Sequence, residues 1–127
     1  LADAPHELPE DPAESFRVVY EHIFHVDLQS NRDILTYLIS NTLRKIDGER
    51  DFIIHVSKED YPYVNMQKKQ MLAGAVAANS NVEIIEDVTL AKNECMIETD
   101  SGIYDCGLGT QLEELRKKLM LLAWQKE

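Results

Sequence analysis

The sequence predicts an α+β fold in which helices pack on a mixed four-stranded sheet, with the elements in the order ααβαβββα. Two observations support this prediction. Two apolar stripes of helical periodicity precede the first β-branched run, and a strand, a tight reversal and a second strand precede a long amphipathic helix. With 127 residues and 44% hydrophobic content, the chain is long enough for one domain with a core.

The first part of the chain is predicted to be a linker followed by two helices. Residues 1–12 hold three prolines among acidic residues and are expected to form a disordered linker, so that the domain covers 13–127. Apolar residues then recur at steps of three and four over 16–24 and 34–46, as in helices that bury one face. Gly48 is expected to end the second helix.

Two strands are predicted on either side of a helical segment. Residues 52–56 and 82–86 are compact runs rich in β-branched side chains. Residues 63–78 between them favour a helix that Gly74 interrupts. Because strand–helix–strand units cross over right-handed, the two strands should be parallel.

A hairpin and a terminal helix are predicted to complete the chain. Residues 95–99 and 103–106 are the expected antiparallel arms, and residues 100–102 are of types that tolerate positive φ in a turn. Thr110 and Glu113 have the spacing of a capping box. Leucines at steps of three and four then predict a helix that runs to the end of the chain.

Composition and charge restrict the classes of partner. The formal net charge of −10 disfavours nucleic acid and anionic membranes, because both would repel such a surface. No apolar run approaches the length of a membrane span, and the amino end lacks the regions of a signal peptide, so a cytosolic location is expected. The chain begins with Leu1 and not with Met, which suggests a fragment of a longer protein.

The two cysteines, Cys95 and Cys106, lie on opposite arms of the predicted hairpin. A two-residue turn would place Cys106 opposite Ile97. Their spacing does not match a metal-binding motif, and the favoured interpretation is two reduced, small hydrophobic residues in or near the core. A disulfide or redox switch is the alternative.

The triplet at residues 100–102, Asp-Ser-Gly, matches that of aspartic proteases, which a small homodimer could form. That chemistry requires the Asp at the end of a buried apolar strand, where two carboxylates share a proton. Here Glu98 and Thr99 precede Asp100, which favours a hairpin turn. No Gly-rich phosphate loop is present, so neither nucleotide hydrolysis nor a cofactor is predicted.

Histidines offer a second candidate for chemistry. His22 and His25 lie three residues apart on the first predicted helix, but the sequence near them offers no third metal ligand, which favours polar-edge positions. His55 alternates with apolar neighbours in its strand, so its side chain should point to the opposite face. We expect it at a sheet edge or under a helix.

The end of the last predicted helix is apolar on every side over residues 119–124. One buried face cannot account for this run. The segment either enters the core of the domain or binds a partner, and exposed Trp, Met and Leu side chains are typical anchors of interfaces. The candidate partner-binding residues are Leu119, Met120, Leu122 and Trp124.

The hairpin and the start of the last helix also contain a recognisable motif. Its residues are Cys95, Ile97, Glu98, Thr99, Gly102, Asp105, Leu108, Gln111, Leu112 and Leu115. These residues resemble a motif in the C-terminal domain of the flagellar assembly protein FliH family. The resemblance covers roughly residues 14–122 and is strongest after residue 82. Asn93 stands where the family usually has Gly, and because Asn is the other residue that adopts left-handed φ at low cost, a turn is expected there. Cys106 and Gly107 stand where the family usually has Ala and Ser.

The resemblance implies a non-catalytic stator that binds and restrains the flagellar type III export ATPase. It also implies a homodimer, and contacts with the export gate and the motor ring through a missing N-terminal region. By resemblance the protein would be cytoplasmic, at the periphery of the membrane export apparatus. The domain is also similar in plan to a stator component of vacuolar-type rotary ATPases. The stator of a virulence type III secretion ATPase, a small acid hydrolase and a peptide-binding adaptor are the alternatives.

Overall fold

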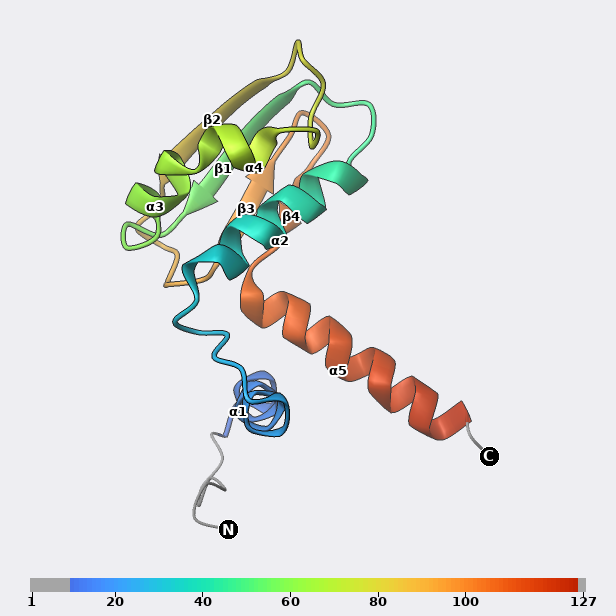
Figure 1. The fold of residues 1–127 in the computed structure, drawn as a ribbon. Helices are drawn as coiled ribbons and strands as arrows, with labels where there is room; N and C mark the ends of the chain where they lie inside the picture. The colour runs from blue at the N-terminus through green and yellow to red at the C-terminus, as the bar shows by residue number, and fades with distance from the viewer. Residues whose placement is uncertain (1–9, 126–127) are drawn as a thin grey trace. The chain divides into compact units, whose positions relative to one another are not determined.

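The computed structural model describes residues 10–125, which form five helices and four strands (Figure 1). In chain order the elements are α1 (Pro12–Phe24), α2 (Arg32–Lys45), β1 (Asp51–Val56), α3 (Tyr61–Met66), α4 (Lys68–Leu72), β2 (Asn81–Glu86), β3 (Cys95–Glu98), β4 (Ile103–Asp105) and α5 (Leu108–Gln125). The predicted α+β class and the order of elements are confirmed. Residues 1–9 of the predicted linker lie outside the described residues, and Pro12 is the first residue of α1, where its missing N–H is not needed.

The strands form one mixed sheet in the order β2-β1-β3-β4. β1 is parallel to β2 and antiparallel to β3, and β3 is antiparallel to β4. Ile54 of β1 lies opposite Ile84 of β2 and Ile97 of β3. The predicted parallel pair and the predicted hairpin are therefore confirmed.

Helices α2, α3 and α4 cover one face of this sheet (Figure 1). The core between them is a single cluster of buried side chains, in which a large apolar side chain contributes about 2 kcal/mol when fully removed from water. Its members are Leu35, Ile39, Leu43, Phe52, Ile54, Val56, Val64, Met71, Ala75, Ile84, Cys95, Ile97 and Cys106. The apolar stripe of α2 and the inward side of the strands, both predicted from periodicity, meet here.

The segment between β1 and β2 differs from the single helix predicted over 63–78. The structure divides it into the short helices α3 and α4, with Gln67 between them outside the helical conformation. The extended Ala73 ends α4, and Gly74 follows with a φ of +71°. Gly74 therefore reverses the chain after the helix has ended, which is the usual role of a glycine in the left-handed conformation.

The hairpin turn is longer than predicted. Four residues, 99–102, connect Glu98 to Ile103, and the Thr99 N–H donates to the Gly102 carbonyl at 2.8 Å. This loop shifts the register, so that Cys106 lies beside Cys95 and Tyr104 lies opposite Ile97. The predicted Cys106–Ile97 pairing is wrong, and so is the positive φ expected in the turn, because none of residues 99–102 has one.

The terminal helix begins two residues before the predicted cap. α5 starts at Leu108, so Thr110 lies inside the first turn and the predicted capping box with Glu113 is wrong. The reason is tertiary. The Leu108 N–H donates to the Asn93 carbonyl at 2.9 Å, which gives the start of the helix a partner that no local sequence pattern records.

The chain falls into two compact units, Arg32–Leu108, and Leu1–Asn31 with Gly109–Glu127. The prediction of one domain over 13–127 stays a prediction, because this division describes compactness and not independent folding. In the second unit, aromatic rings on α1 contact one another at a tilt, with centroids 6.1 Å apart for Phe16 and Tyr20 and 4.6 Å apart for Tyr20 and Phe24. Among residues 10–125, no helix combines the length and the apolar character needed to cross a membrane.

Candidate functional site

A network of backbone contacts connects the end of β1, the start of β3 and the start of α5. Asn93 is nearly buried and has a φ of +67°, which confirms the left-handed turn predicted there. Its N–H donates to Oδ2 of Asp60 at 2.7 Å, and its carbonyl accepts from Leu108. The turn therefore connects the start of β3 with Leu108, the first residue of α5.

Gly107 lies against the backbone of the same turn. A Cβ atom at this position would lie 3.1 Å from the Asn93 carbonyl oxygen and 3.1 Å from the Glu94 Cα. The Gly107 N–H donates to Oδ1 of Asp105 at 3.0 Å, which holds the residue in this close approach. The small residue at position 107 is thus a requirement of packing.

Ser57 and Asp60 extend this network to the segment between β1 and α3, where the sequence predicts the start of a helix. The buried Ser57 hydroxyl donates to Oδ2 of Asp60 at 3.0 Å, and the Asp60 N–H donates back to the Ser57 oxygen at 3.0 Å. The Ser-x-x-Asp spacing is the local signal of such a reciprocal pair. The contact from Asp60 to Asn93 spans 33 residues and has no local signal.

Cys95 and Cys106 are both free and fully buried, as predicted for small hydrophobic residues of the core. The hydrogen bond with Cys106, together with burial, raises the pKa of the Cys95 thiol far above its usual range. Because the thiolate is the reactive form, Cys95 is held in its unreactive state.

The side chain of His55 lies between two carboxylates, those of Asp87 and Glu98. Its Nδ1 lies 3.2 Å from Oδ2 of Asp87, and its Nε2 lies 2.9 Å from Oε1 of Glu98. Both carboxylates are hydrogen-bond acceptors, so a ring nitrogen that carries a hydrogen can donate to either of them. The expectation that His55 lies at a sheet edge is wrong, because β1 is a central strand, and α2, α3 and α4 pack on the opposite face.

Asp87 has further partners in the loop after β2. Its Oδ1 accepts the Thr89 hydroxyl at 2.5 Å and the Thr89 N–H at 2.9 Å. Hydrogen bonds from Thr89, and to a smaller extent the contact with His55, lower the pKa of the Asp87 carboxyl. The carboxylate is therefore stabilised in its charged form beside His55.

The other residues that the sequence analysis considered for catalysis or metal binding do not form a site. Asp100 is exposed in the hairpin loop. His25 lies beyond the last residue of α1 and has a φ of +55°, so the His22–His25 pair predicted on one helix does not form. Within residues 10–125, no three His, Cys, Asp or Glu side chains are grouped as a metal site requires.

The motif residues divide between the interior and the surface. Cys95, Leu108 and Leu112 are buried, Glu98 and Gln111 are half-buried, and Gly102 and Asp105 are exposed. The buried members belong to the core or to the start of α5, where they support the fold. Glu98 and Asp105 point to the other face of the sheet, because they alternate with Cys95, Ile97 and Tyr104 along their strands.

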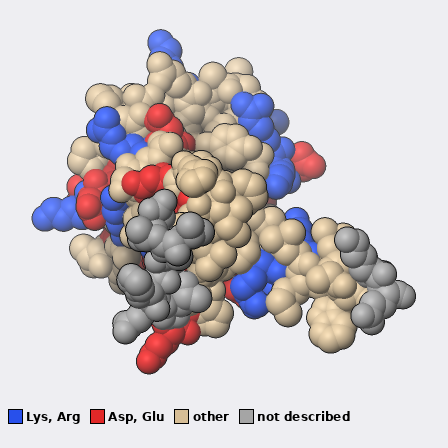
Figure 2. Space-filling model, turned by 60° about the horizontal axis from the view of Figure 1, so that its bottom comes forward, with Lys and Arg blue, Asp and Glu red and all other residues tan. Residues whose placement is uncertain are grey.

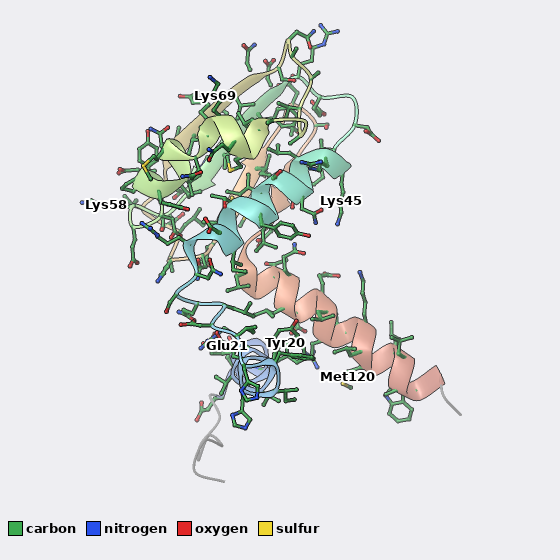
Figure 3. The ribbon with its side chains drawn as sticks, viewed as in Figure 1. Tyr20, Glu21, Lys45, Lys58, Lys69 and Met120 are labelled. Carbon is green, nitrogen blue, oxygen red and sulfur yellow. The ribbon has the colours of Figure 1, made fainter. Side chains whose placement is uncertain are left out.

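The end of α5 carries a run of exposed apolar side chains. The four candidate partner-binding residues are exposed by 47% at Leu119, 50% at Met120, 61% at Leu122 and 74% at Trp124. Figure 3 shows Met120 on this helix, and Tyr20 and Glu21 on α1. Exposed anchors of these types are enriched in protein interfaces. Their binding role stays a prediction.

Three basic residues, Arg116, Lys117 and Lys118, immediately precede this segment. The guanidinium of Arg116 pairs with Glu113 one turn earlier, at 2.6 and 2.9 Å, whereas Lys117 and Lys118 are exposed. From residue 115 to residue 125 the sequence has three basic side chains and no acidic one. The face of the molecule in Figure 2 shows basic and acidic groups next to one another in several places, with other residues between these places.

Comparison with known proteins gives two matches. The model of a family described as flagellar assembly protein FliH matches residues 18–115. The chain is also 28% identical over 89 residues to the flagellar assembly protein FliH of Borreliella burgdorferi. That alignment covers 70% of this chain and 29% of the Borreliella protein, so the chain spans less than a third of its relative.

Proposed function

This chain belongs to the FliH family of flagellar assembly proteins, and from that premise we propose that it is a non-catalytic stator of the flagellar type III export ATPase. In this role it binds the ATPase and supports the export and assembly of flagellar proteins. The observation that supports the proposal most directly is the family match over residues 18–115, which includes the sheet and the start of α5.

The proposed setting is the cytoplasmic side of the membrane export apparatus. We propose that the protein acts as a homodimer, and that contacts with the export gate and the motor ring use parts of the full-length protein other than this chain. The relative is more than three times as long as the aligned region, which leaves room for such parts.

The proposed contact surface for the ATPase is the apolar end of α5. Leu119, Met120, Leu122 and Trp124 offer a large exposed apolar surface, and the neighbouring lysines give it a positive charge. A few large apolar anchors usually supply most of the binding energy of an interface. The surface therefore suits a partner with an apolar, acidic recess.

Co-purification with the cognate ATPase tests both parts of the proposal. The unmodified chain should capture the ATPase, and the Leu119→Asp, Trp124→Asp double variant should weaken capture by about a hundredfold or more, because two anchors become charged. The matched control is Met66→Asp, which alters a similarly exposed methionine on α3 and should leave capture unchanged.

Two results would count against this proposal in different ways. If the unmodified chain fails to capture the ATPase, the stator function is wrong for this chain. If the double variant captures it as well as the control does, the ATPase binds elsewhere and the end of α5 is not the contact surface.

A further inference from the structure

The sheet has two edge strands, β2 on one side and β4 on the other. β4 has three residues, whereas β2 has six, all of which pair with β1. An edge strand keeps one row of backbone N–H and C=O groups for which the sheet itself supplies no partner. β2 is therefore the longer of the two edges at which a further strand can pair.

The hydrogen bonds of β2 show which of its backbone groups point away from the sheet. The N–H groups of residues 81 and 87 donate to carbonyls in the neighbouring segment 50–56, at 2.8 Å each. Because the residues that bond to one neighbour lie two apart along a strand, residues 83 and 85 also bond to β1. The residues whose backbone groups point away from β1 are Val82, Ile84 and Glu86.

A groove of about 1350 Å³ includes the first half of β2 in its wall. Its lining combines residues 81–83 with Met66, Lys69 and Leu72 of α3 and α4, and all of it belongs to the unit Arg32–Leu108. Met66 is 68% exposed, and Figure 3 shows Lys69 on α4. A strand added to the edge of β2 therefore has side chains of two helices beside it.

The two sides of the sheet differ along this edge. Ile84 faces the core, so on that side an added strand lies next to Met66, while Lys69 disfavours a basic side chain there. Glu83 points to the opposite side and is exposed, and Glu98 lines the same groove. The edge therefore matches a strand with apolar side chains on one side and basic side chains on the other.

The charges of β2 disfavour a second copy of this chain at the same edge. The strand carries Glu83 and Glu86 and no basic residue. Two such strands side by side would bring carboxylates together, and like charges on an edge oppose the pairing of identical sheets. The same carboxylates attract a strand that carries Lys or Arg.

We infer that the edge of β2 binds an extended segment of another protein by strand addition, and that apolar side chains alternate with Lys or Arg in this segment. The backbone of the segment pairs with the outward N–H and C=O groups of β2. Its apolar side chains pack beside Met66, and its basic side chains meet Glu83. The inference does not rest on the proposed stator function, which uses the end of α5.

Hydrogen exchange in the full ¹⁵N-labelled chain tests the edge. In the free chain the outward amides of residues 82, 84 and 86 should exchange at least about tenfold faster than those of residues 83 and 85. The probe is a peptide of about eight residues in which valine and lysine alternate, which is long enough to span β2. At saturation it should slow the outward amides and leave the exchange of residues 83 and 85 unchanged.

Two N-methylated forms of the peptide separate strand addition from attraction between side chains. Only one of the two alternating sets of peptide N–H groups can face β2. Methylation of that set should weaken binding at least about tenfold, and methylation of the other set less than about threefold. A peptide of the same composition in the order Val-Val-Lys-Lys mixes both types on each side and should bind about fivefold more weakly.

Two variants with matched controls test the side chains. Met66→Ser should weaken binding of the alternating peptide by about fivefold, whereas Tyr37→Ser, at a similarly exposed site on α2, should leave it unchanged. Glu83→Lys should weaken it by about fivefold, whereas Glu59→Lys, which changes the net charge equally at another exposed position, should have less than about a twofold effect.

Four outcomes would overturn the inference. Equal loss with both N-methylated peptides would show that no strand is added, and equal loss in the variants and their controls would show nonspecific attraction. Protection of the outward amides in the free chain at every dilution would show that the chain occupies its own edge. Protection that disappears on dilution would assign the edge to a second copy.

The proposed ATPase contact can fail independently of this inference. The Leu119→Asp, Trp124→Asp variant, which should lose capture of the ATPase, should still bind the alternating peptide. Loss of peptide binding in this variant would place the peptide on α5 and not on β2.

Discussion

The core of the sheet and the end of α5 contain the same kinds of side chain and place them in opposite environments. Ile39, Ile54 and Ile97 are completely buried between the sheet and its helices, whereas Leu121 and Leu122 are more than half exposed. In this core, the helices and the strands each present one apolar face, and the two faces cover each other. In α5, apolar residues occur on all sides of the helix, so a single packing partner cannot cover them.

This difference separates residues that hold the fold from residues available for binding. A buried isoleucine stabilises the native state through lost contact with water and through close packing. An exposed leucine contributes little to either until another molecule covers it. Substitutions in the two regions should therefore affect different measurements.

The largest expected effect distinguishes the two regions directly. Ile54→Ala should lower the free energy of unfolding by about 3 kcal/mol, because it leaves a cavity in the core, and Ile54→Val by about 1 kcal/mol. Leu121→Ala should change it by less than about 0.5 kcal/mol, because Leu121 is 62% exposed. Urea unfolding followed by circular dichroism measures all three. Equal destabilisation by Ile54→Ala and Leu121→Ala would remove the distinction between the regions.

A smaller effect is expected at the position where the sheet leads into α5. Gly107→Ala should lower the free energy of unfolding by about 2 kcal/mol, because the new methyl group would press on the backbone of the Asn93 turn. Gly109→Ala is the control, since a Cβ there meets no atom within 4 Å. If the unfolding curves of both variants match that of the unmodified chain, the Asn93 turn accommodates the new methyl group without loss of stability.

The smallest effect is expected in the stability of the protein at acid pH. The pKa of Asp87 is lowered in the folded state, so its carboxylate contributes stability above the pKa of the unfolded chain, near 4, and this contribution is lost as the pH falls through the folded value. Asp87→Asn should therefore flatten the decline in stability below about pH 4. Thermal unfolding between about pH 2 and pH 7 measures this difference.

The control for that experiment is Asp100→Asn in the exposed hairpin loop. The stability of this variant should fall at acid pH as much as that of the unmodified chain. If Asp87→Asn shows the same decline as this control, the contacts of Asp87 with Thr89 and His55 do not stabilise the folded state.

Elements whose signal lies within a few residues were predictable. Residues 52–56 and 82–86 were predicted as strands, and the structure begins each strand one residue earlier and ends it at the predicted position. Asn93 was predicted in a left-handed turn because few other residues adopt that conformation at low cost. In contrast, the predicted capping box at Thr110 failed, because Leu108 finds its hydrogen-bond partner in a distant turn.

For the candidate sites, the apolar end of α5 was visible in the sequence because it lacks a polar side. The face of the sheet opposite α2, α3 and α4 was not recognisable in the sequence in the same way. Ile53, Ile85, Met96 and Ile103 come from four separate strands, and only the register brings them together. Single strands of three to six residues give no indication of which face a helix will cover.

By itself, the sequence determined the class of fold, the order of its strands and helices and the resemblance to the FliH family, because each depends on periodicity, turn-forming residues or a contiguous motif. Only the tertiary structure decided that Cys106 lies beside Cys95, that His55 lies between Asp87 and Glu98, and that α2, α3 and α4 pack on the same face of the sheet. The physical reason is distance along the chain. Each of these features depends on partners brought together by the pairing of strands, and local conformational preference does not specify that pairing.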